Sequence, residues 1–323
     1  MRAAGSHPDH GGRILSTHQH NGNAPHAISV RGLRKAYGPV QAVDGLDLDV
    51  PTGEIFGLLG PNGAGKTTAL EIIEGLREPD DGEVTVLGRR PWPRSPALLR
   101  RIGVQLQRSS VFDELTAREQ LVTFADLYGA PTDAADRLLA AVGLEESARV
   151  RTKKLSGGQQ QRLSIACAIV HTPELVFLDE PTAALDPQAR RNLWDLIRDL
   201  RRDGATVVLT THSMEEAEVL CDRVAIMDAG RLLAVDAPAA LVRALDLPVR
   251  ITLPPEAMSV QEARALPGVS DVDTGQAVLT LRGADPAVIL GGLAQQGRLG
   301  GLQVRGATLE DVFLHHTGRE YRA

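Results

Sequence analysis

Short apolar runs alternate with longer amphipathic stretches over most of this chain. The runs predicted as strands lie at residues 54–59, 175–179, 206–210 and 223–228. Those at 175–178 and 207–209 are continuously apolar, which is typical of strands covered on both faces. The pattern therefore predicts an α/β unit over residues 27–238, built on a mainly parallel sheet with helices around it.

The character of the chain changes between residues 107 and 154. The segments LTAREQLVTFADLYG and AADRLLAAVGL repeat their apolar residues at helical spacing, and no strand pattern interrupts them. We therefore expect a helical subdomain at about residues 108–165, inserted into the α/β unit.

The two ends of the chain follow other patterns. Residues 1–26 hold five histidines among Gly, Asn, Ser and Pro, and are predicted as a disordered tail rather than a metal site. After residue 238, VRITL, SVQEARAL, GVSDV, AVLTLR, DPAVILGGLAQQ and LQVR are predicted as strand, helix, two strands, helix and strand, before a final helix TLEDVFLHHTG. The order βαββαβ is typical of a small split-βαβ domain. Residues 239–323 are therefore expected to form an accessory α+β domain.

Composition narrows the classes of function. The net charge of −6 disfavours a nucleic-acid binder that relies on phosphate contacts, and an aromatic content of 3% disfavours base stacking. Cys167 and Cys221 lie in apolar runs without CxxC spacing, so both are predicted to be buried, reduced thiols. No run approaches the roughly 18 to 20 apolar residues of a membrane span. We expect a soluble chain without bound nucleic acid.

The segment GPNGAGKTT at residues 60–68 fits the phosphate-binding pattern GxxxxGK[ST] and follows an apolar strand, as that motif requires. Glycines in the loop permit turns that a Cβ would block, so that backbone amides and the start of the next helix point at phosphate oxygens. Lys66 is expected to reach the β- and γ-phosphates, and the Thr67 hydroxyl to bind Mg²⁺. The other loop residues expected at the nucleotide are Gly60, Pro61, Asn62, Gly63, Ala64, Gly65 and Thr68.

The segment LVFLDEP at residues 175–181 ends an apolar strand in two acids. In open α/β sheets, ligands lie at the carboxyl ends of the strands. Asp179 is therefore expected to hold Mg²⁺, directly or through water, and Glu180 to act as general base for the attacking water.

GPNGAGKTT, LSGGQQQ and LVFLDEP occur in this order, and together they resemble the motifs of ATP-binding cassette (ABC) ATPases. The resemblance covers about residues 28–238. It implies the ABC ATPase fold, with a RecA-like mainly parallel core, a β-rich N-terminal part and an inserted helical subdomain. ATP and Mg²⁺ are the cofactors it implies.

The same resemblance implies roles for single residues elsewhere. Gln107 in RIGVQLQ fits the Q-loop glutamine, which contacts Mg²⁺ and a membrane partner; Gln105 is a nearby alternative that the spacing disfavours. Asp186 in AALDP fits the D-loop aspartate, although two alanines precede it where many relatives have Ser or Gly. His212 in LTTHSMEEAE fits the switch histidine at the γ-phosphate. Tyr37 in RKAYGPV fits the aromatic residue that stacks on adenine.

The signature LSGGQ is expected at a helix start, so it offers free amides and a positive dipole end. By resemblance, Ser156, Gly157, Gly158 and Gln159 face the γ-phosphate of ATP held by another subunit. The expected assembly is a head-to-tail dimer, formed with itself or with a related ATPase subunit, in which each ATP is held between two chains.

A single cassette with a short insert and no heptad run favours a transport subunit over a soluble ABC ATPase. The segments at 308–320 and 221–238 resemble the tails of daunorubicin-resistance-type exporter ATPases, which work with ABC-2-type permeases and export drugs, antibiotics or other lipophilic compounds. We therefore expect a peripheral subunit at the cytoplasmic face of the cell membrane, bound to a separate permease. An importer, a lipid or polysaccharide exporter, and a soluble non-transport ABC ATPase are the alternatives.

Overall fold

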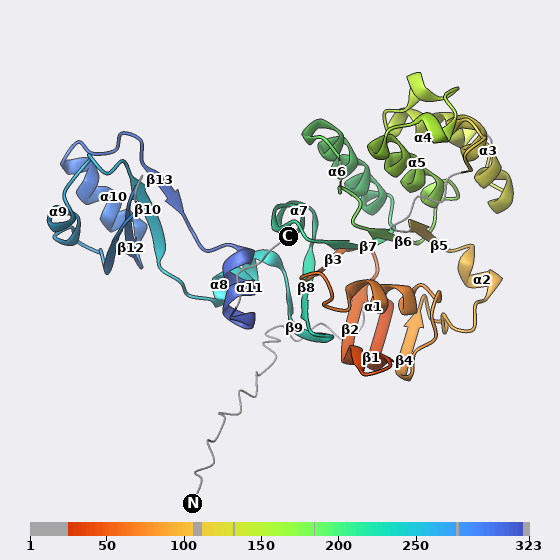
Figure 1. The fold of residues 1–323 in the computed structure, drawn as a ribbon, viewed down its shortest axis with the longest axis horizontal. Coiled ribbons are helices and arrows are strands. Elements are labelled where there is room, and N and C mark those ends of the chain that lie inside the picture. The colour runs from red at the N-terminus through yellow and green to blue at the C-terminus, as the bar shows by residue number, and fades with distance from the viewer. Residues whose placement is uncertain (1–24, 106–111, 132, 184, 276–277, 319–323) are drawn as a thin grey trace, which may run out of the picture. The chain divides into compact units, whose positions relative to one another are not determined.

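The computed structural model describes residues 25–105, 112–131, 133–183, 185–275 and 278–318 (Figure 1). Contacts divide the chain into two compact units, the first ending at Pro238 and the second beginning at Ala239. Within these residues, no helix has the length and apolar character needed to cross a membrane. The predicted histidine-rich tail falls, up to residue 24, outside the described residues.

The first unit is organised around a central sheet with strand order β5-β6-β7-β3-β8-β9. Every neighbouring pair is parallel except β8 and β9. The strands are β3 Ile55–Leu59, β5 Ile102–Gln105, β6 Leu175–Asp179, β7 Thr206–Thr211, β8 Arg223–Asp228 and β9 Arg231–Asp236. All residues of β3, β6 and β7 are buried, as in strands covered on both faces. The mainly parallel sheet expected from the apolar runs is therefore confirmed.

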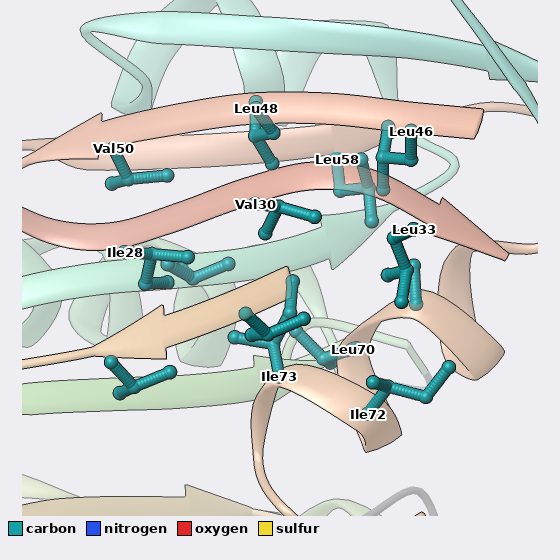
Figure 2. Close-up of a cluster of buried hydrophobic side chains, with 14 of the residues drawn as sticks. Ile28, Val30, Leu33, Leu46, Leu48, Val50, Leu58, Leu70, Ile72 and Ile73 are labelled. Carbon is teal, nitrogen blue, oxygen red and sulfur yellow. The ribbon is translucent and has the colours of Figure 1, made fainter. Parts of the chain in front are cut away.

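An antiparallel sheet with order β2-β1-β4 makes the N-terminal part β-rich, as expected. Its strands are β1 His26–Tyr37, β2 Val40–Pro51 and β4 Asp81–Val86. Figure 2 shows their apolar side chains facing helix α1 (Lys66–Ile73) and strand β3 in one buried cluster, which includes Ile28, Val30, Leu33, Leu46, Leu48, Val50, Leu58, Leu70, Ile72 and Ile73. This core fixes α1, the helix that begins at the expected phosphate loop.

The insert between β5 and β6 is helical in its described part. It contains α3 Ala117–Tyr128, α4 Asp133–Ala141, α5 Gly157–Ile169 and two short 3₁₀ turns, η1 Glu145–Ser147 and η2 Thr152–Lys154. A separate apolar core holds the three helices together, with Leu121, Leu139 and Leu163 at most 2% exposed. The remaining helices of the first unit are α2 Pro96–Leu99, α6 Pro187–Arg202 and α7 Met214–Leu220, and α8 Pro238–Ala244 lies at the boundary between the units.

The second unit has the element order βαββαβ that its sequence predicts. Its elements are β10 Val249–Leu253, α9 Val260–Arg264, β11 Asp271–Thr274, β12 Leu279–Gly283, α10 Pro286–Gln295, β13 Gln303–Arg305 and the final helix α11 Leu309–Thr317. The sheet order is β11-β12-β10-β13, with antiparallel neighbours throughout. The strand expected at 268–272 is observed three residues later, as β11. Gly268, where it was expected to begin, adopts φ +81°, a left-handed conformation outside the strand region.

The two cysteines are buried and free, as predicted. Burial raises the pKa of the Cys167 thiol to about 12. Burial also raises the pKa of the Cys221 thiol well above its usual value. Both side chains are therefore protonated thiols at neutral pH.

Candidate functional site

The loop between β3 and α1 uses backbone conformations that only glycine adopts easily. Gly60, Gly63 and Gly65 have φ angles of +154°, +80° and +96°. A Cβ on Gly60 would lie 2.3 Å from the carbonyl oxygen of Met227, and one on Gly65 would lie 2.1 Å from that of Ala42. The loop therefore needs glycine both for its turns and for its close approach to neighbouring backbone.

Lys66 begins α1 and points into this loop. Its side chain is buried, and Nζ donates to the carbonyl oxygens of Gly60 at 2.6 Å and Pro61 at 3.1 Å. Burial lowers the pKa of Lys66, while Glu180 and Asp179 act in the opposite direction. The ammonium group thus lies inside the loop and interacts electrostatically with the carboxylates of Asp179 and Glu180.

The other residues of the loop divide by exposure. Asn62, Gly63 and Thr67 are exposed, Thr68 is half-buried and Ala64 is buried. The hydroxyl of Thr67, the second residue of α1, is therefore open to a ligand at the helix N-terminus, which is where anions and their metal ions bind.

Asp179 and Glu180 follow each other at the carboxyl end of β6 and are both tied to Thr210 on β7. The Thr210 hydroxyl donates to Asp179 Oδ1, and the backbone N–H of Glu180 donates to Thr210 Oγ1 at 3.0 Å and Thr210 O at 3.2 Å. Burial raises the pKa of Asp179, and the Thr210 hydrogen bond opposes that shift. Sequence reasoning missed Thr210, although it lies two residues before His212 and pairs with Asp179 in the strand register.

His212 comes directly after β7 and faces the general-base candidate. Its Nδ1 lies 3.5 Å from Glu180 Oε1, and its side chain is 40% exposed. The structure therefore brings Lys66, Asp179, Glu180 and His212 into one cluster at the carboxyl ends of neighbouring parallel strands, where ligands bind in open α/β sheets.

The residues present fit a magnesium ion held between protein and phosphates. Mg²⁺ prefers oxygen ligands and uses one or two protein groups besides phosphates and water. Thr67 offers an exposed hydroxyl, and Asp179 offers a buried carboxylate whose hydrogen bond comes from a neutral hydroxyl. In the described part of the chain, no group of three or more His, Cys, Asp or Glu residues has metal-binding geometry. Gln107, the third predicted ligand, falls outside the described residues.

Tyr37 lies at the end of β1, opposite Val40 in the β1–β2 hairpin. Its ring is 40% exposed, and the Arg77 guanidinium lies 5.3 Å from the ring centroid. The same hairpin carries Ala42, whose carbonyl contacts the phosphate loop at Gly65. An exposed aromatic ring therefore lies on the element that borders the loop.

The signature forms the first turn of α5. Ser156 caps the helix: its hydroxyl accepts from the Gln159 N–H at 3.3 Å, and Gln159 Oε1 accepts from the Ser156 N–H at 2.9 Å. Gln159 Nε2 also donates to Ser147 at 3.1 Å. A Cβ added to Gly157 would meet no atom of a neighbouring segment within 4 Å in the described residues. The capping box presets this turn, and Ser156 and Gly157 are exposed.

Asp186 is the N-cap of α6. Its Oδ1 accepts from the N–H groups of Gln188 and Ala189, each at 2.9 Å, and these bonds lower the pKa of Asp186. Among the described residues, no hydrogen bond or ion pair joins Asp186 or Ser156 to the cluster around Glu180. Ser156 and Asp186 thus cap the two helices α5 and α6, and their side chains are not bonded to the cluster around Glu180 in the described residues.

Comparison with known proteins identifies the family. Residues 43–183 match the family model of the ABC transporter. The Nod factor export ATP-binding protein I of Rhizobium sp. (strain N33) is 40% identical over 303 residues, covering 91% of this chain and 98% of that protein. The protein of the same name from Sinorhizobium fredii (strain NBRC 101917 / NGR234) is 41% identical over 309 residues, covering 92% and 87%.

Solved structures agree with this assignment. An ATP-binding subunit of an ABC transporter matches with a TM-score of 0.63 at 30% identity, over 68% of this chain and 93% of that one. A dimeric ATP-binding cassette in a post-hydrolysis state, bound to ADP and Pi, matches with a TM-score of 0.60 at 28% identity, over 65% and 98%. With relatives this similar over nearly their whole length, and with a phosphate loop and acid pair in place, the chain belongs to the ABC transporter family, as an ATP-binding member that hydrolyses ATP with Mg²⁺.

Proposed function

We propose that this chain is the ATP-hydrolysing subunit of an exporter, of the daunorubicin-resistance type, that works with a separate ABC-2-type permease. The observation that carries the proposal is the match over 303 residues to a protein named for export. Because the first unit ends at Pro238, that match extends into the second unit. The proposed substrate is a drug, an antibiotic or another lipophilic compound, because residues 308–320 resemble the tails of daunorubicin-resistance-type exporter ATPases.

The phosphate loop is proposed to hold the nucleotide. Its amides and Lys66 bind the phosphates, after the ammonium group leaves the loop carbonyls that it contacts in the structure. Tyr37 stacks on adenine. Thr67, Asp179 and Gln107 hold Mg²⁺, which, when bound, neutralises charge that develops on the phosphates.

Glu180 is the proposed general base for the attacking water, and His212 contacts the γ-phosphate. The 3.5 Å separation between His212 Nδ1 and Glu180 Oε1 supports a shared task at one phosphoryl group. Removing a general base of this kind costs about 100- to 10,000-fold in rate.

The signature and the D-loop are proposed to act across a head-to-tail dimer, formed with itself or with a related subunit. Ser156, Gly157, Gly158 and Gln159 face the γ-phosphate bound by the partner, and Asp186 lies at the same interface. The exposure of Ser156 and Gly157 at the start of α5 supports this division, since the first turn of that helix is then open to a second chain. Removing one hydrogen-bond donor aimed at developing charge costs about 100- to 1000-fold in rate.

The transport role is tested by identifying the proteins that co-purify with this chain. The tagged full-length protein is purified from detergent-solubilised membranes of its source cell, and its partners are identified by mass spectrometry. We expect an integral membrane protein of about six apolar spans, with the chain at the cytoplasmic face. Recovery with ribosomes and never with membranes would contradict the proposal in favour of a soluble ABC ATPase.

The direction of transport and the class of substrate need a second assay. Inverted membrane vesicles, which expose the chain and its permease to the outer medium, receive MgATP and a fluorescent lipophilic dye in that medium. Accumulation of the dye, absent in a Glu180→Gln control, is the expected result. Uptake in right-side-out vesicles would instead indicate an importer.

A further inference from the structure

We propose that Gln161 is a positioning residue that fixes the backbone of Glu180 to the signature helix α5. The proposal rests on the proposed role of Glu180 as general base. Gln161 Nε2 donates to the carbonyl oxygen of Glu180 at 3.3 Å, in a partly buried contact between segments 19 residues apart. Figure 1 shows α5 beside the strands β5 and β6.

The backbone of Glu180 needs such support. Glu180 has φ +48°, a left-handed conformation that a non-glycine residue adopts only when its surroundings enforce it. Thr210 holds its N–H from β7. On the other side, its carbonyl accepts from Gln161 and from the N–H of Ala183 at 3.2 Å, which closes the turn toward the D-loop. Of these bonds, the one from Gln161 alone comes from the helical subdomain.

The contact connects two proposed binding surfaces. α5 begins at Gly157 and reaches Gln161 after four residues, which is about 6 Å along the helix axis. The first turn is preset by its capping box, so a displacement of the signature by the partner's ATP is transmitted to Gln161 as a rigid shift. Engagement of one site then adjusts the general base of the other site in the same chain.

Gln160 provides a matched control on the same helix. Its Nε2 donates to the carbonyl oxygen of Thr152 at 3.0 Å, within the helical subdomain, and it makes no contact with Glu180 among the described residues. Gln160→Leu and Gln161→Leu therefore make the same chemical change at adjacent positions, and only the second removes a bond to Glu180.

The experiment compares MgATP hydrolysis by full-length wild type, Gln161→Leu, Gln160→Leu and Glu180→Gln. For Gln161→Leu we expect kcat to fall about 10- to 100-fold with KM for ATP within about twofold, because misplacement of a reacting group lowers rate rather than binding. The Hill coefficient for ATP is expected to fall toward 1. Gln160→Leu should keep kcat, KM and the Hill coefficient within about twofold of wild type. If Gln161→Leu does not fold, Gln161→Met, which keeps the unbranched chain, takes its place.

The outcomes separate the two proposals. Equal kcat for Gln161→Leu and wild type, or equal losses in both glutamine variants, would overturn the role of Gln161 while Glu180→Gln stays inactive. Full activity in Glu180→Gln would overturn the proposed general base itself, whatever the glutamine variants do.

Discussion

At the scale of single residues, Thr210 holds both acids of the site with one hydroxyl. The hydroxyl donates to the Asp179 carboxylate and accepts from the backbone N–H of Glu180, so a neutral group orients one carboxylate without cancelling its charge and fixes the backbone of the other acid. Holding Glu180 in a left-handed conformation costs on the order of 1 to 3 kcal/mol. The bonds from Thr210 offset part of that strain.

Thr210→Val is therefore expected to impair catalysis while preserving the shape of the side chain. Removing a hydrogen-bond partner of a metal ligand typically costs about 10- to 100-fold in metal affinity or activity. If Asp179 holds Mg²⁺ as proposed, the MgATP turnover of the variant should fall within that range and its half-saturating Mg²⁺ concentration should rise. Titration of ATPase rate against Mg²⁺ measures both. Thr206→Val, on the same strand but bonded to the Gly53 N–H at 2.9 Å, is the control. Identical Mg²⁺ curves for the two variants would contradict this role.

Glu54 makes stability depend on pH. Burial raises the pKa of Glu54 from 4.5 to about 7, and Arg223, 3.4 Å away, opposes the shift. Between pH 4.5 and 7 the folded chain thus binds more protons than the unfolded chain, so this residue's contribution to stability falls as pH rises and then levels off.

We expect Glu54→Gln to remove that dependence. Relative to wild type, the free energy of unfolding of the variant should rise by up to about 1.4 kcal/mol per pH unit between pH 5 and 7. Urea unfolding at several pH values gives the difference. A constant offset between the two proteins across this interval would show that Glu54 titrates normally.

At the scale of elements, α6 and α7 are joined by a buried hydrogen bond. Trp194 Nε1 donates to Glu216 Oε1 at 3.1 Å, and Glu216 is fully buried. The other carboxylate oxygen, Oε2, has no partner among the described residues. α6 begins at Pro187, directly after its N-cap Asp186, and α7 begins two residues after His212, so this bond connects the helices that follow two of the predicted site residues.

Trp194→Phe should destabilise the first unit by about 1 to 3 kcal/mol, because it leaves a buried carboxylate oxygen unsatisfied. Unfolding by urea, followed by circular dichroism, measures the loss. Trp92→Phe is the matched control, because Trp92 is 37% exposed and its replacement should change stability by less than about 0.5 kcal/mol. Equal stability of the two variants would contradict the assigned cost.

Features of this structure were predictable from the sequence where their signal is local in the chain. The four inner strands of the central sheet, β6, β7, β3 and β8, were predicted from their apolar runs, whereas the edge strands β5 and β9 were not. The motifs around Glu180 were recognisable because each is local in the chain. The capping box of Ser156 also had a signal, since Ser followed three residues later by Gln is a known pattern. Thr210 and Gln161 had none in a single sequence, because their contacts join segments distant in the chain.

At the scale of the whole molecule, nucleotide binding should stabilise the first unit. A ligand at 100 times its dissociation constant adds about 2.7 kcal/mol to the stability of the folded state. Lys66→Ala should abolish most of the shift in the thermal midpoint that saturating MgATP produces in wild type, because the ammonium group in the loop is lost. Differential scanning calorimetry with and without MgATP tests this, and a full shift in the variant would contradict the phosphate role of Lys66.

In the proposed dimer, each ATP-binding site is completed by the signature of a second chain. The most direct test of this arrangement is the mass of Glu180→Gln in solution, measured by light scattering with and without MgATP. We expect a monomer without nucleotide, a dimer with saturating MgATP, and a monomer again when Gly157→Asp is added, because a carboxylate then faces the partner's γ-phosphate. Two results together would contradict the shared site. Glu180→Gln would bind MgATP to saturation as a monomer, and the specific ATPase activity of the wild type would not change with protein concentration.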